Sequence, residues 1–262
     1  MLHNDSSSFS PIPTSCEEIK NKQPNSPSGV YLLATNDGTK HTYCNMEELC
    51  GLGGGWTRLA YLDMTDATVN CPSGFRLHQS GGVRACGRAT SNLGICTSVQ
   101  FPSNGISYSE VCGRVVGYQW GSPDAVAVDD INSYYVDGVS ITHGSPRQHV
   151  WTLMAGVHSH NCPCSLDSTR AVHSFIGNDY FCESGNPATD GTFQAILYTS
   201  DPLWDGKGCG SLEGVCCNAS GLPWFNKVLN TASTDYLELR VCADSGTTDE
   251  DVPVSYYELY VK

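Results

Sequence analysis

Residues 236–242 read Tyr-Leu-Glu-Leu-Arg-Val-Cys, which is the clearest strand pattern in the chain. Apolar side chains alternate there with polar ones, at the period of two that places one face of a strand in a core. An acidic stretch follows, and in residues 254–261 Tyr257, Leu259 and Val261 again share one face. The two runs predict a long antiparallel hairpin at the end of the chain.

Similar segments recur upstream between clusters of Gly, Pro and Asn, and they are typical of strands. They span residues 30–34, 56–61, 111–120, 149–157 and 192–198. One helix is indicated at residues 15–21, because Ser15 precedes Glu18 by three positions, as in a capping box. With 27 Gly and 13 Pro among 262 residues, the sequence predicts a β-dominated, loop-rich globule.

The composition favours a secreted protein. The chain has 14 Cys, a density that is common in secreted disulfide frameworks and rare in the reducing cytosol. Its formal charge of -13 argues against nucleic acid as a partner, because binding to phosphates requires basic surfaces. No run of 18 apolar residues occurs, so we expect no membrane insertion. Asn218, in Asn-Ala-Ser, is a candidate glycosylation site.

The first residues differ from the rest of the chain. Residues 1–14 are rich in Ser and Pro and predict a flexible leader, and the structured domain is expected over residues 15–262. The leader does not carry the apolar segment of a signal peptide. Secretion therefore implies that a signal was removed or that the chain is one domain of a longer protein.

The opening of the domain resembles a known family. The matching stretches are Ser-Cys-Glu-Glu-Ile at 15–19, Ser-Gly-Val-Tyr at 28–31, Asp-Gly at 37–38, Tyr-Cys-Asn-Met-Glu at 43–47 and Gly-Gly-Gly-Trp-Thr at 53–57. In order and spacing, residues 15–60 resemble the opening subdomain of the fibrinogen-related domains. The resemblance implies a disulfide between Cys16 and Cys44. Residues 145–151 are loosely similar to a stretch of the intelectins, and the remainder resembles uncharacterised secreted invertebrate proteins with the same opening.

Acidic residues in the predicted hairpin loop are candidate metal ligands. Ca²⁺ takes six to eight oxygens from flexible loops of this kind, whereas the alternative is a solvated acidic turn. A second acidic segment spans residues 124–137, and the His and Cys residues of 158–164 leave a zinc site open beside the alternative of oxidised cysteines. The candidate calcium ligands are Asp244, Asp249, Glu250 and Asp251.

Aromatic side chains beside carboxylates on Gly-rich loops are typical of sugar sites. Trp204 lies between Asp201 and Asp205, and Trp224 follows further along the chain. The alternative is that each Trp packs beneath its own loop. His149, next to Arg147, is the position that we would test for ligand binding or catalysis, because no hydrolase, zinc-protease or phosphate-loop motif occurs.

These observations predict one disulfide-bonded α+β domain with a fibrinogen-like opening. From the resemblance we expect a secreted recognition module that binds carbohydrate, in the manner of a lectin, with Ca²⁺ as its candidate cofactor. The alternative is a structural or adhesive extracellular module that binds protein partners or forms a homo-oligomer. A secreted hydrolase is the least favoured of the three.

Overall fold

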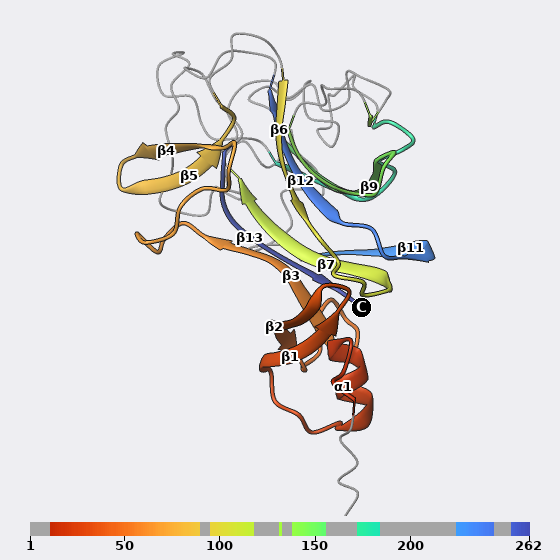
Figure 1. The fold of residues 1–262 in the computed structure, drawn as a ribbon. Helices are drawn as coiled ribbons and strands as arrows, with labels where there is room; N and C mark the ends of the chain where they lie inside the picture. The colour runs from red at the N-terminus through yellow and green to blue at the C-terminus, as the bar shows by residue number, and fades with distance from the viewer. Residues whose placement is uncertain are drawn as a thin grey trace, which may run out of the picture.

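The computed structural model describes residues 11–89, 95–117, 131–132, 138–155, 172–183, 224–243 and 253–262. In this part of the chain, thirteen strands form two sheets, and there is one helix of seven residues (Figure 1). The expected α+β class is therefore wrong, because the described part is all-β. No helix in it is long and apolar enough to cross a bilayer.

The larger sheet has β13 at its centre. This strand pairs antiparallel with β3 along one edge and with β7 along the other, and β7 in turn pairs with β11. β2 joins β1 to β3, and β5 joins β4 to β13. The eight strands are β1 (Gly29–Thr35), β2 (Gly38–Asn45), β3 (Trp56–Asp63), β4 (Arg76–Ser80), β5 (Val83–Gly87), β7 (Tyr108–Gly117), β11 (Phe225–Ser233) and β13 (Val254–Val261).

The smaller sheet has the order β10-β9-β8-β12-β6. Its strands are β6 (Ile95–Phe101), β8 (Gly138–His143), β9 (Gln148–Ala155), β10 (Tyr180–Glu183) and β12 (Leu237–Ala243). The predicted terminal hairpin is wrong, although both of its segments are strands. β12 pairs with β6 on one edge and β8 on the other, so its backbone ladder is complete, and β13 lies in the other sheet.

The main core lies between the two sheets. Leu237, Leu239 and Val241 of β12 pack in one cluster with Tyr257 and Leu259 of β13, so the alternating pattern places its apolar face in the core as predicted. The polar side chains of β12 are buried too. Glu238 is 0% and Arg240 1% exposed. Glu238 accepts a hydrogen bond from the Arg147 guanidinium at 2.9 Å, which compensates its buried charge.

Residues 15–60 form the lower end of the molecule in Figure 1, where α1 (Cys16–Lys22) lies beside the β1–β2 hairpin. The Ser15 hydroxyl accepts a hydrogen bond from the Glu18 backbone N–H at 3.1 Å, so the capping prediction is confirmed. Cys16 and Cys44 are joined by a disulfide, which is the pairing that the resemblance implied. Gly54 lies against the Met46 carbonyl, where a Cβ would come within 2.0 Å of the oxygen.

Three further disulfides connect distant parts of the described chain. Cys50–Cys112 ties the opening residues to β7, Cys71–Cys86 holds the segment before β4 against β5, and Cys96–Cys242 links β6 to β12. The prediction of a disulfide-bonded protein is therefore confirmed. These bonds, with the described part lacking a membrane helix, fit an extracellular protein.

Candidate functional site

Two adjoining cavities lie where β9 of the smaller sheet meets β11 of the larger sheet. The histidine cavity, of about 450 Å³, is lined by residues that include His143, Gln148, His149, Lys227 and Asp235. The tryptophan cavity, of about 200 Å³, is lined by residues that include Trp151, Asn178, Asp179, Trp224 and Asn226. Small-molecule sites usually occupy roughly 300–1,000 Å³, so the histidine cavity falls within this range and the tryptophan cavity lies below it.

Successive parts of each strand line the two cavities in turn. On β9, residues 148 and 149 line the histidine cavity, while residues 150 and 151 line the tryptophan cavity. On β11, residues 225 and 226 line the tryptophan cavity, and residues from 227 onward line the histidine cavity. An ion pair between Lys227 and Asp179 connects the two cavities. The cavities therefore lie side by side, with this ion pair between them.

His149 is the most unusual group of the site. Its side chain is 9% exposed, and neither ring nitrogen has a hydrogen-bond partner among the described residues. The ring contacts Phe175 edge-on, with centroids 6.0 Å apart. Burial lowers the pKa of His149 to about 4, with Asp179 opposing the shift and Lys227 adding to it. The imidazole is therefore neutral at physiological pH, with one donor and one acceptor that no described residue satisfies.

A second histidine of the same cavity is held beside a carboxylate. The His143 Nδ1 lies 3.7 Å from the Asp235 Oδ2, and burial lowers the pKa of His143 while Asp235 opposes this shift. The Ser233 hydroxyl donates to the same carboxylate oxygen at 2.9 Å. Gly144 lies next to this carboxylate, where a Cβ would come within 2.7 Å of the oxygen. The missing side chain of Gly144 thus allows Asp235 to approach His143.

Trp224 borders the tryptophan cavity and is 37% exposed. The Arg114 guanidinium lies 4.5 Å from the centroid of the Trp224 ring, and Tyr260 packs 6.2 Å away. These contacts hold the indole in place. The surrounding lining supplies amide and carboxylate oxygens from Asn178, Asp179 and Asn226. An aromatic ring beside planar acceptors can bind the C–H face and the hydroxyls of a sugar.

The remaining predicted site residues have different outcomes. Arg147 lines neither cavity, because its guanidinium bonds Glu238, so it does not form a unit with His149. Within the described ranges, no cluster of three or more His, Cys, Asp or Glu side chains could hold a metal. Outside the described residues lie the 158–164 zinc alternative, the 192–198 strand, Asp201, Trp204, Asp205, Asn218, Asp244, Asp249, Glu250 and Asp251.

Several residues of the site had not been singled out from the sequence. Among them, His143 lies on β8, Asp179 precedes β10, Lys227 lies near the start of β11, and Asp235 lies two residues after the end of β11. They are neighbours only because the two sheets stack, so no spacing along the sequence could have predicted that they form one site. No protein-family model matches the sequence. The resemblance of residues 15–60 to fibrinogen-related domains therefore stays a prediction.

Proposed function

We propose that the protein is a secreted recognition module that binds carbohydrate in the site between β9 and β11. The observation that carries the proposal is the buried imidazole of His149, whose two nitrogens have no partner in the described part of the chain. Leaving a buried polar group unsatisfied costs about 1–3 kcal/mol, so a bound molecule that satisfies both nitrogens gains affinity there. A sugar hydroxyl both donates and accepts, as a neutral imidazole requires.

The tryptophan cavity supports the same class of ligand. Trp224 offers a partly exposed ring, and Asn178 and Asn226 supply amides next to it. Carbohydrates present apolar C–H faces and polar edges together, so a site with both kinds of wall suits them better than a purely apolar or purely charged one. The disulfides support secretion, because they persist in oxidising compartments.

Binding of the full chain to an array of glycans tests the proposal. We expect the variants His149→Phe and Trp224→Ala to lose most of the binding of the wild type. His149→Phe replaces the imidazole by an apolar aromatic ring of similar size, which has no hydrogen-bonding nitrogen, so the fold should be retained. Leu77→Ala, which truncates an exposed apolar residue of β4, is the control and should bind normally. Unchanged binding by His149→Phe would contradict the proposal.

We also propose that Ca²⁺ contributes, through Asp244, Asp249, Glu250 and Asp251. A cation that binds only the folded protein stabilises it, by about 2.7 kcal/mol at a hundredfold excess over Kd. Melting should therefore rise in millimolar Ca²⁺ relative to chelator, and the double variant Asp249→Asn with Asp251→Asn should abolish the rise. Equal melting in Ca²⁺ and chelator would mean that this loop is a solvated turn.

One observation favours the alternative of an adhesive or structural module. Val30 and Leu32 lie two residues apart on β1, the last strand in the order of the larger sheet, and they are 64% and 40% exposed. An apolar strand at a sheet edge is a typical site of self-association. Concentration-dependent oligomerisation that Val30→Thr abolishes, together with an array on which no glycan binds, would favour this function.

A further inference from the structure

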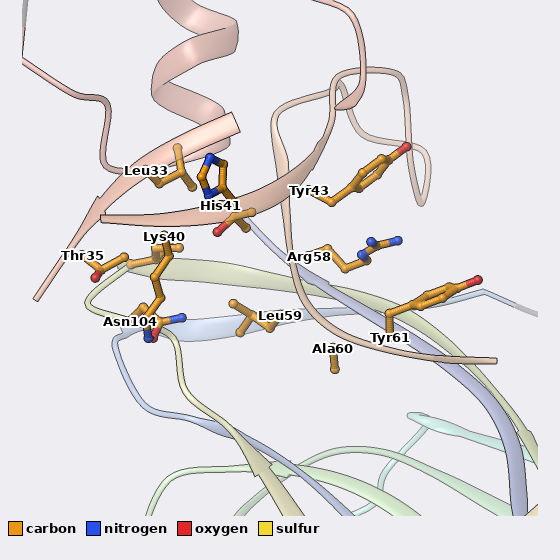
Figure 2. A pocket seen from close by; sticks show the side chains of 12 residues that line it. Leu33, Thr35, Lys40, His41, Tyr43, Arg58, Leu59, Ala60, Tyr61 and Asn104 are labelled. Carbon is orange, nitrogen blue, oxygen red and sulfur yellow. The ribbon is translucent and has the colours of Figure 1, made fainter. Parts of the chain in front are cut away.

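A third cavity, of about 290 Å³, opens between β2 and β3 and contains an arginine held between two aromatic rings (Figure 2). The Arg58 guanidinium lies 4.3 Å from the centroid of the Tyr43 ring and 4.5 Å from that of Tyr61. Figure 2 shows the guanidinium between the two rings, with both phenol hydroxyls pointing to the same side as its nitrogens. Cation–π contacts on both faces hold the guanidinium in one orientation.

The geometry of the larger sheet explains both the cavity and the position of Arg58 between the two tyrosine rings. β2 pairs with β3 only at Cys44–Thr57 and Asn45–Trp56, after which the two strands diverge. The pairing of β3 with β13 has an irregularity that places Arg58 opposite Tyr260 and Tyr61 opposite Glu258. Tyr260 and Glu258 are two residues apart and share a face of β13. Arg58 and Tyr61 therefore share that face, although they are three positions apart in the sequence.

The charge of Arg58 is not compensated by any carboxylate in the described part of the chain. Its polar neighbour is the Tyr260 hydroxyl. Arg114, the other arginine of this face that contacts aromatic rings, bonds the Glu258 carboxylate at 2.5 Å. Glu258 also accepts hydrogen bonds from Tyr256 and Tyr260.

The rest of the lining adds positive charge and hydrogen-bonding groups. Lys40 reaches across the other end of the cavity and donates to the Asn104 side-chain oxygen at 2.5 Å. His41 and Thr42 line the cavity between Lys40 and Tyr43, and no Asp or Glu belongs to this described lining. The cavity thus has a cation at each end and polar side chains between them.

We propose that this cavity binds an acidic saccharide, with Arg58 and the hydroxyls of Tyr43 and Tyr61 holding one of its sulfate or carboxylate groups. A planar guanidinium donates two parallel hydrogen bonds to such an oxyanion, and its fixed position reduces the entropy lost on binding. Lys40 holds a second anionic group further along the saccharide. This site goes beyond the function proposed above, because it lies on β2 and β3 and takes a charged ligand.

Calorimetric titration of the full chain with a sulfated disaccharide tests the proposal. The desulfated disaccharide, inorganic sulfate and a Glu-rich peptide serve as comparison ligands. We expect the sulfated disaccharide to bind most tightly and its affinity to fall with salt, because the contact is largely electrostatic. Equal binding of the desulfated form, equal binding of inorganic sulfate, or tighter binding of the peptide would each overturn the assignment.

Variants locate the binding. Arg58→Gln should weaken the sulfated disaccharide about tenfold or more, as expected for loss of a charged hydrogen-bonded pair. Tyr61→Phe keeps the ring contact and loses the hydroxyl, so it should weaken binding less and leave melting unchanged. Lys22→Gln removes one exposed positive charge of α1 and is the matched control. Normal affinity for the sulfated disaccharide in both Arg58→Gln and Tyr61→Phe would refute the proposal. If only His149→Phe loses affinity, the disaccharide binds in the histidine cavity instead.

Discussion

Trp151 of β9 stacks on Phe225 of β11, with ring centroids 4.9 Å apart and planes 13° apart. Each ring belongs to a different sheet, and both are buried. Both also line the tryptophan cavity, so the contact that joins the sheets forms a wall of the candidate site. Stability and ligand binding should therefore change together when this pair is altered.

Phe225→Ala should destabilise the protein by about 3–5 kcal/mol, because it removes a large core side chain and leaves a void beside Trp151. It should also weaken saccharide binding. Denaturant unfolding with intact disulfides measures the first effect. Val228→Ala, an exposed truncation on the same strand, is the control and should change stability by less than about 0.5 kcal/mol. Similar losses in both variants would contradict the packing described for Phe225.

Gly54 and Gly53 form a matched pair of adjacent glycines. A Cβ on Gly54 would lie 2.0 Å from the Met46 carbonyl oxygen, whereas a Cβ on Gly53 would meet nothing within 4 Å. Gly54→Ala should therefore cost at least about 1–3 kcal/mol, since the clash is with backbone that cannot rotate away. Gly53→Ala should be nearly neutral. Comparing the melting temperatures of the two variants checks this. Equal melting temperatures would mean that the backbone at Gly54 does not lie close to the Met46 carbonyl.

Stability should fall as the pH falls from 6.5 to about 4. In this window the unfolded chain protonates His149 at its ordinary pKa of 6.5, whereas burial holds the folded pKa at about 4. The unfolded state binds more protons, so unfolding becomes easier as the pH falls. The effect of this residue is about 3 kcal/mol over the window.

His149→Phe should flatten the same pH profile, measured by denaturant unfolding at several pH values. His78 contributes separately, because burial first and then Arg76 and Arg88 lower its pKa to about 4. His78→Phe should therefore remove a further part of the fall in unfolding free energy with falling pH. Parallel profiles for wild type and His149→Phe would show that the imidazole is not buried in its neutral form.

Glu238→Gln should destabilise the protein by about 3–5 kcal/mol at neutral pH, because the change leaves Arg147 and the buried Arg240 without their shared carboxylate. Glu47→Gln, at an exposed acid before β3, removes the same charge and should have little effect. Unfolding curves of the two variants at one pH check this difference. A loss below about 1 kcal/mol for Glu238→Gln would contradict a buried ion pair.

Local patterns predicted the elements but not their partners. The Ser15–Glu18 spacing predicted the start of α1, because a capping hydrogen bond joins residues three apart. The alternation at 236–242 predicted β12 and its core face. The predicted hairpin between β12 and β13 was wrong, because β6 and β8 occupy the two edges of β12 and strand partners are not encoded in a local pattern. Strands β4, β5, β6, β8, β10 and β11 were not predicted either.

The amino-acid sequence by itself determined the disulfide-bonded character, the capped helix and the strands whose apolar residues alternate, since each depends on composition or on neighbours along the chain. Only the tertiary structure decided which strands pair and which polar side chains lie inside. His149 and Trp224 were candidates from the sequence, but their joint site exists because β9 and β11 belong to sheets that stack. Burial then keeps the imidazole neutral, and burial is a property of the packed molecule rather than of residue order.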